Sequence, residues 1–210
     1  MQLLSKQEEA IYYLKDNETK ELIYGGAAGG GKSALEVLKI IENCQIYPGS
    51  RWLLGRAKLK ALKETTLNTF FELSSNLKLN DQWHYNSQSG VITWTNKSEI
   101  LLKDLFLYPS DPNFDSLGSL EITGGFIDEC NQCVYKAWQI VLSRCRYKLT
   151  EWDVHGERTD TMKVLKRNES GVAILWLNSK GEATPGLIPK LVGTCNPAKN
   201  WVYSKFYLKH

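Results

Sequence analysis

Residues 26–33 read Gly26-Ala27-Ala28-Gly29-Gly30-Gly31-Lys32-Ser33, which matches the phosphate-binding loop pattern G-x-x-x-x-G-K-[ST] at every position. The apolar run 21–24 before it is typical of a strand, and residues 34–41 after it have helical periodicity. Glycines let backbone N–H groups turn inward around phosphate oxygens, which a Cβ at most of these positions would obstruct. This context predicts a phosphate-binding loop rather than a glycine-rich turn that binds nothing.

Each residue of the loop has an expected role. Lys32 should reach the β- and γ-phosphates of a nucleotide, and the Ser33 hydroxyl should ligate Mg²⁺. The helix N-terminus adds its partial positive charge beneath the anion. The backbone that cradles the phosphates is expected to come from Gly26, Ala27, Ala28, Gly29, Gly30 and Gly31. The expected ligands are therefore ATP and Mg²⁺.

A second signal is the run 122–129, an apolar segment that ends in Asp128 and Glu129. A buried strand with this ending is what a phosphate-loop hydrolase needs. Asp128 would hold Mg²⁺ from the side opposite Ser33, and Glu129 would orient and deprotonate the attacking water. A glutamate in this place favours hydrolysis over transfer to the hydroxyl of a small molecule.

Length and charge set the frame for these motifs. A chain of 210 residues can bury one substantial core, so we expect a single α/β domain over residues 1–210. The net charge of +3 is too small to indicate a nucleic-acid binder by itself. Lys and Arg nevertheless cluster in 58–63 and 144–148, which is consistent with a local basic surface or simply with a solvated face.

The sequence has neither a signal peptide nor an apolar run long enough to span a bilayer, so we expect a soluble intracellular protein. Its five cysteines form no spaced framework, which fits reduced thiols. Cys130 and Cys133 have the spacing of half a zinc site or of a redox pair. No second pair completes a zinc site, and packing thiols are the favoured interpretation.

In the first half of the chain, a helix is expected from Ser5 into the first strand. It carries Gln7, whose amide suits the edge of an adenine ring, although an exposed helix residue is the simpler alternative. Residues 51–56 predict a core strand that delivers Arg56 to the edge of the sheet where the loop lies, because ligands gather at the carboxyl ends of parallel strands. Helix 58–73 follows.

The middle of the chain predicts an antiparallel meander, from three short β-rich runs at 83–85, 91–94 and 99–102. Helix 132–146 is then expected after the acidic strand. It ends in Arg144 and Arg146, which either complement the helix dipole or stabilise charge on a transferring phosphoryl group.

The last part begins with the polar stretch 150–167, which is typical of a mobile excursion. Strands are predicted at 172–177 and 191–194. The second strand leads to Asn196, which would either sense the γ-phosphate or belong to a strand-ending Asn-Pro turn.

In this order and spacing, the motifs resemble the N-terminal ATPase domain of the large terminase subunit of tailed bacteriophages. The segments that carry the resemblance are Gln7, the loop 26–33, the Arg56 strand, the meander that ends before Asp111-Pro112, Phe126-Ile127-Asp128-Glu129 and Gly193-Thr194-Cys195-Asn196-Pro197. The resemblance implies a RecA-like P-loop NTPase fold of the glutamate-bearing (ASCE) class, with a mostly parallel sheet flanked by helices and an antiparallel β-meander insertion.

The resemblance also implies an activity and a setting. The family hydrolyses ATP to move double-stranded DNA into a procapsid. It works as a homo-oligomeric ring on the portal protein, together with a small terminase subunit, in the cytoplasm of the infected bacterium. Family members also carry a nuclease domain. Because this sequence stops at His210, we expect an isolated ATPase domain or a truncated form.

This chain departs from the family in its arginines. Many terminases place an arginine inside the loop, where this chain has Ala27, Ala28, Gly29 and Gly30. Others place one just ahead of the acidic strand, where it has Leu117-Gly118-Ser119. Arg144, Arg146 and Arg56 remain as candidates for the activating arginine. Two other functions stay open, a helicase- or recombinase-like DNA-dependent ATPase and a weakly catalytic, ATP-gated assembly module.

Overall fold

The computed structural model describes residues 5–16, 18–26, 29–146, 163–167, 173–177, 183–185 and 189–208. Two elements precede the loop and two follow it directly: α1 (Ser5–Lys15), β1 (Glu21–Gly25), α2 (Lys32–Ile46) and β2 (Arg51–Arg56). The middle of the chain forms α3 (Leu59–Glu64), α4 (Thr66–Asn76), β3 (Trp83–Asn86), β4 (Val91–Trp94) and β5 (Glu99–Asp104). The remaining elements are β6 (Gly124–Ile127), α5 (Tyr135–Arg144), β7 (Lys163–Arg167), β8 (Ala173–Leu177), β9 (Ala183–Pro185) and β10 (Leu191–Cys195).

The main sheet has seven strands in the order β1-β10-β6-β2-β5-β4-β3. The pairs β1–β10, β10–β6, β6–β2 and β2–β5 are parallel, so five strands end at one edge. In register, Tyr24 lies beside Thr194, and Gly193 lies beside Ile127. This arrangement confirms the predicted mostly parallel sheet. Its carboxyl edge brings together four segments that are distant in sequence: the loop, Arg56, Asp128 and Asn196.

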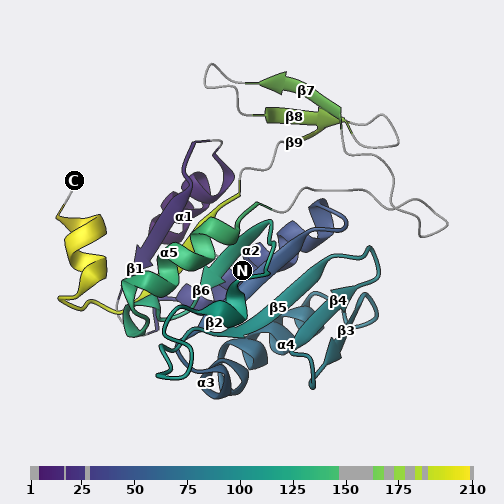
Figure 1. Cartoon of the computed structure of the whole chain (residues 1–210). Helices are drawn as coiled ribbons and strands as arrows, with labels where there is room; N and C mark the ends of the chain where they lie inside the picture. The colour runs from purple at the N-terminus through teal and green to yellow at the C-terminus, as the bar shows by residue number, and fades with distance from the viewer. Residues whose placement is uncertain are drawn as a thin grey trace.

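Helices cover both faces of this sheet (Figure 1). The cluster on one face joins α1, α2 and α4 to the sheet, and the cluster on the other face joins α5 to it. Trp52 and Leu54 belong to the first cluster and Leu53 to the second, as the twofold alternation of a strand requires. Cys130 and Cys133 are free thiols buried in the second cluster, as the packing interpretation predicts.

The predicted helix 58–73 is two helices, α3 and α4, separated at Thr65. The backbone of Thr65 leaves the helical region, with φ −124° and ψ −80°. Its hydroxyl accepts a hydrogen bond from Arg56, and the hydroxyl of the next residue, Thr66, donates to Asp128. These contacts with the strand ends explain the break, which turns two hydroxyls toward the carboxyl edge of the sheet.

The predicted antiparallel meander is confirmed, and it is joined to the main sheet. Strand β5 pairs with β4 on one side and runs parallel to β2 on the other, so β3 and β4 extend the main sheet. The predicted helix 132–146 is also shorter than expected. A 3₁₀ turn, Cys130–Gln132, comes first, and α5 ends at Arg144.

Strands β7, β8 and β9 form a second, antiparallel sheet. Residues 163–167 are therefore a strand, contrary to the predicted polar excursion 150–167, because β8 supplies their backbone partners. The rest of that excursion lies outside the described residues, as do Ala27 and Ala28 of the loop. Among the described helices, none has both the length and the apolar character needed to cross a membrane.

Candidate functional site

The phosphate loop passes from β1 into α2 through two glycines in the left-handed region. Gly29 has φ 80° and Gly31 has φ 66°. A Cβ on Gly31 would also lie 2.5 Å from Gln7 Nε2, so both conformation and space require glycine there. The Lys32 ammonium donates to the carbonyl oxygen of Gly26 at 2.9 Å, which brings the lysine back over the start of the loop. The Lys32 ammonium and the partial positive charge at the N-terminus of α2 therefore lie together where a phosphate would bind.

Gln7 lies beneath this loop and is only 3% exposed. Its Nε2 donates to the carbonyl oxygen of Gly31 at 3.3 Å. The alternative of an exposed helix residue therefore does not hold. The structure places Gln7 as a support of the loop, and its contact with an adenine ring stays a prediction.

Three hydroxyl groups surround the carboxylate of Asp128 at the end of β6. Thr194 donates to Oδ1 at 2.9 Å and Ser33 to the same oxygen at 3.3 Å, while Thr66 donates to Oδ2 at 2.5 Å. The structure thus brings Ser33 and Asp128 together from positions 95 residues apart. A serine hydroxyl facing a carboxylate offers the hard oxygen donors that Mg²⁺ prefers. The residues present therefore fit this ion.

Arg56 joins the two acidic residues from the end of β2. Its Nη2 lies 2.6 Å from Glu129 Oε2, and its Nη1 lies 3.4 Å from Asp128 Oδ2 and 2.7 Å from the Thr65 hydroxyl. The three charged side chains are well shielded, with 12% of Arg56, 5% of Asp128 and 25% of Glu129 exposed. Arg56 therefore lies in the candidate site of its own chain, in contact with both acids.

Glu129 stands at a sharp turn of the backbone. Its φ of 49° and ψ of 48° lie in the left-handed region, which costs a non-glycine residue about 1–3 kcal/mol. The 3₁₀ turn that begins here brings Gln132 back, so that its Nε2 donates to the Glu129 carboxylate. Such local strain is found where the orientation of a side chain matters.

Glu36, on α2, is a buried acid that the sequence patterns do not reveal. It is 2% exposed, and neither of its carboxyl oxygens has a hydrogen-bond partner in the part of the chain that the structure describes. Burial is the largest cause that raises the pKa of the Glu36 carboxyl group well above its ordinary value, and the negative charge of Asp128 is the next. The neighbouring Thr194 lowers this pKa in part. Burial therefore favours the neutral form of the Glu36 carboxyl group over its charged form.

Asn196 follows β10 directly, beside the loop. The carbonyl oxygen of its neighbour Cys195 accepts a hydrogen bond from the Gly26 amide at 3.2 Å. The side-chain Oδ1 of Asn196 is buried without a partner among the described residues. An unfilled acceptor at this edge is compatible with a polar ligand group, and its role as a phosphate sensor stays a prediction.

Arg144 and Arg146 lie at the other end of the sheet. The Ile122 amide, ahead of β6, donates to the carbonyl oxygen of Arg144, whereas Asp128 follows the carboxyl end of the same strand. Arg146 forms an exposed ion pair with Glu121 at 3.4 Å. Leu117, at the family's second arginine position, is buried in the core. Both arginines therefore lie away from the candidate site of their own chain.

The residues that sequence patterns miss are Thr66, Gln132 and Glu36. Thr66 is fully buried, yet it falls within a run of helical periodicity that gives no sign of the break beside it. Gln132 lies three residues after Glu129, a spacing compatible with a turn, but glutamine is common on surfaces. Only the fold brings these side chains to the acids.

Comparisons with known proteins point to one group of structures. No protein-family model matches the sequence, and no curated protein matches it. Among solved structures, the large terminase of a thermophilic bacteriophage, determined in complex with ADP, matches 99% of this chain with a TM-score of 0.64 and 14% identity. The HK97 bacteriophage large terminase matches 100% of it with a TM-score of 0.59 and 14% identity.

The ATPase domain of the Thermus phage P74-26 large terminase matches 99% of this chain, with a TM-score of 0.54 and 10% identity. The match covers 87% of that domain, but only 42% of the ADP-bound terminase and 38% of the HK97 terminase. The chain thus spans less than half the length of these two large terminases. At these identities the likeness shows the fold alone, and that fold is the one of phage large terminase ATPase domains.

Proposed function

We propose that this chain hydrolyses ATP with Mg²⁺ to drive the movement of double-stranded DNA. One observation carries the enzymatic part. The Ser33 hydroxyl, at the end of the loop that carries Lys32, lies 3.3 Å from the carboxylate of Asp128, which belongs to a separate motif and is followed directly by Glu129. This set of groups is what phosphoryl transfer to water requires.

Each residue has a part in the proposed reaction. The loop backbone and Lys32 bind the β- and γ-phosphates, while Ser33 and Asp128 hold Mg²⁺, which neutralises charge on the phosphates when it is bound. Glu129 takes a proton from the attacking water as its oxygen bonds to the γ-phosphorus and the bond to the bridging oxygen breaks. Thr66 and Thr194 fix the Asp128 carboxylate through their hydroxyls.

Two arginines take different parts in this proposal. Arg56 is the cation within the site, where it balances the charges of Asp128 and Glu129. Arg144, at the end of its own sheet opposite the site, approaches the site of a neighbouring copy in a ring. Arginines supplied by a neighbour accelerate phosphoryl transfer by on the order of 10³-fold or more.

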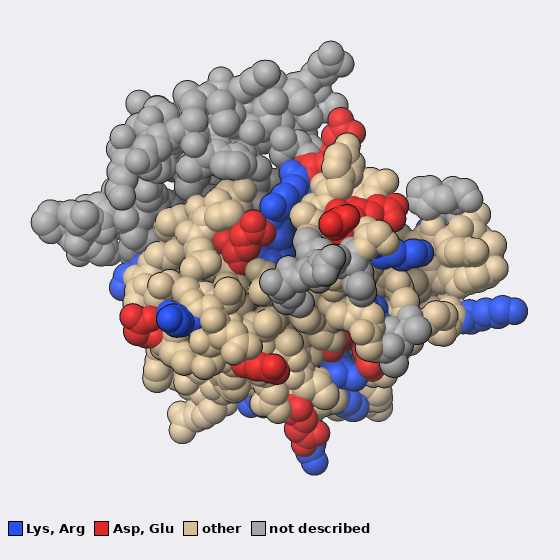
Figure 2. Space-filling model, turned by 180° about the vertical axis from the view of Figure 1, so that it is seen from behind, with Lys and Arg blue, Asp and Glu red and all other residues tan. Residues whose placement is uncertain are grey.

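The motor function is proposed from the fold, which is that of phage large terminase ATPase domains, and nucleotide binding is supported by a terminase of this fold determined with ADP. The proposed partners are double-stranded DNA, the portal protein and a small terminase subunit, with the chain in a homo-oligomeric ring inside the infected bacterium. Charge alone does not identify a DNA surface. On the described part of the face in Figure 2, Lys and Arg are interspersed with Asp and Glu.

The experiment is DNA packaging with purified procapsids that carry the portal protein. ATP and the protein are added, and the DNA protected from nuclease is measured, with Glu129→Gln as the inactive control. We expect protection that depends on ATP, on the portal and on Glu129. Separation of the strands of a duplex without a portal would contradict the terminase assignment and favour a helicase. Nucleotide-dependent ring formation without turnover would favour an assembly module.

A further inference from the structure

A cavity of about 750 Å³ opens beside the phosphate loop, on the α5 face of β1. Its size falls within the range of small-molecule sites, roughly 300–1,000 Å³. Gly25 and Gly26 form one wall, and Cys195 and Pro197 lie at the end of β10. The cavity therefore begins where the loop begins.

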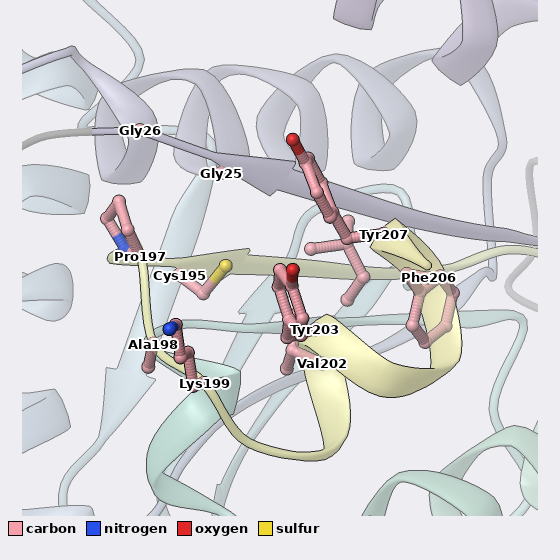
Figure 3. A pocket seen from close by; sticks show the side chains of 11 residues that line it. Gly25, Gly26, Cys195, Pro197, Ala198, Lys199, Val202, Tyr203, Phe206 and Tyr207 are labelled. Atoms are coloured by element: carbon pink, nitrogen blue, oxygen red, sulfur yellow. The ribbon is translucent and has the colours of Figure 1, made fainter. Parts of the chain in front are cut away.

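Aromatic side chains close the cavity from the last described segment of the chain. Tyr203 and Tyr207 line it, with ring centroids 5.0 Å apart and planes 20° from parallel. Figure 3 shows both rings projecting toward β1 from the last helical turn, Tyr203–Tyr207, and the Cys195 thiol beside β10. Tyr207 is 71% exposed, so an outer ring face remains accessible. Lys199 adds a cation at the rim.

The opposite side of β1 offers less room. The cavity between α1 and β1 measures about 200 Å³, below the usual size of a ligand site. Gln7, on helix α1, is buried, and its side-chain amide donates a hydrogen bond to the carbonyl oxygen of Gly31. The nucleoside part of a nucleotide whose phosphates lie in the loop would therefore meet a larger and more aromatic surface on the α5 side of β1.

We propose that the cavity lined by Tyr203 and Tyr207 binds the purine base of the nucleotide whose phosphates lie in the loop. This inference rests on the proposed function, because it assumes that the loop binds ATP. A flat, apolar base suits tyrosine faces, and its stacking on an aromatic ring contributes roughly tenfold or more to affinity. The side chains Ile23 and Val202 provide the apolar remainder of the wall.

Calorimetric titration of the whole chain tests the assignment, with two ligands in the presence of Mg²⁺. ATP reports on the loop and the base site together, and inorganic tripolyphosphate reports on the loop alone. The variants are Tyr203→Ala, which removes the ring, and Tyr203→Phe, which keeps it. The matched control is Tyr12→Ala, which removes an exposed tyrosine of α1.

We expect Tyr203→Ala to weaken ATP binding by roughly tenfold while tripolyphosphate binding stays unchanged. Tyr203→Phe and Tyr12→Ala should bind both ligands as the unmodified chain does. Unchanged ATP affinity in Tyr203→Ala, or an equal loss for both ligands, would overturn the base site and leave the loop assignment standing. If the unmodified chain binds neither ligand, the proposed function fails and the base site fails with it.

Discussion

Replacing Arg56 with alanine should destabilise the protein more than replacing the arginine at the other end of β2. Arg56 pairs with both acids of the site. Its Nη1 lies 3.4 Å from Asp128 Oδ2, and its Nη2 lies 2.6 Å from Glu129 Oε2. Its loss leaves two neighbouring carboxylates, 5% and 25% exposed, without their counter-charge. Removing one partner of a buried ion pair typically costs about 3–5 kcal/mol. Because Asp128 keeps three hydroxyl donors, we expect about 3 kcal/mol, at the low end of that range.

This cost is measurable as a melting temperature. For chains of this length, 1 kcal/mol corresponds to about 2–4 °C, so Arg56→Ala should melt about 6–12 °C below the unmodified protein. Thermal unfolding followed by circular dichroism, without nucleotide, provides the measurement. Mg²⁺ with ATP should restore part of the loss, because the bound cation supplies positive charge beside Asp128.

Arg51→Ala is the matched control, since Arg51 begins the strand that Arg56 ends. Arg51 pairs with Glu99 at 2.8 Å, but about a third of each side chain is exposed, 31% and 32%. Exposed pairs contribute at most about 1 kcal/mol, so we expect a shift of no more than about 4 °C. Equal decreases in melting temperature for the two variants would refute the reasoning, because the shielded contacts of Arg56 would then stabilise the fold no more than the exposed pair of Arg51.

Three further predictions concern activity. Glu129→Gln should keep Mg·ATP binding and lose hydrolysis, whereas Asp128→Asn should also weaken Mg²⁺-dependent binding, as measured by calorimetry and phosphate release; equal binding losses would contradict the division of roles. Turnover per molecule should rise with protein concentration, because a neighbour must supply an arginine, and a constant specific activity across the range of assembly would argue against this. Arg144→Ala should bind nucleotide but turn over slowly, and mixing it with Glu129→Gln should restore some activity, whereas Arg56→Ala should show no such rescue. Absence of rescue for Arg144→Ala would remove it from the role in trans.

Much of the site could be predicted from sequence because its main parts are local patterns. The loop 26–33, the strand that ends at Arg56 and the run that ends in Asp128-Glu129 can each be recognised within a few residues. Parallel pairing of β1, β10, β6, β2 and β5 then places the carboxyl ends of these five strands at one edge. The resemblance to terminases rests on these same segments.

The remaining parts depend on contacts between distant residues. Thr66 reaches Asp128 across 62 positions, and the helix breaks beside it although the periodicity continues. Glu36 follows Ser33 by three positions on an amphipathic helix, yet it is buried against the sheet. No local pattern distinguishes such residues from ordinary helix positions, because only packing against the sheet gives them their role.

The most direct measurement of the central claim is the release of inorganic phosphate from ATP by the purified chain and by Lys32→Ala, with and without Mg²⁺, at concentrations high enough for assembly. Lys32 supplies the positive charge of the loop that reaches the β- and γ-phosphates. We predict that the unmodified chain releases phosphate only with Mg²⁺, and that Lys32→Ala releases none and binds ATP more weakly. Turnover retained by Lys32→Ala, or no release by the unmodified chain at any concentration, would contradict the assignment of this site as an ATPase.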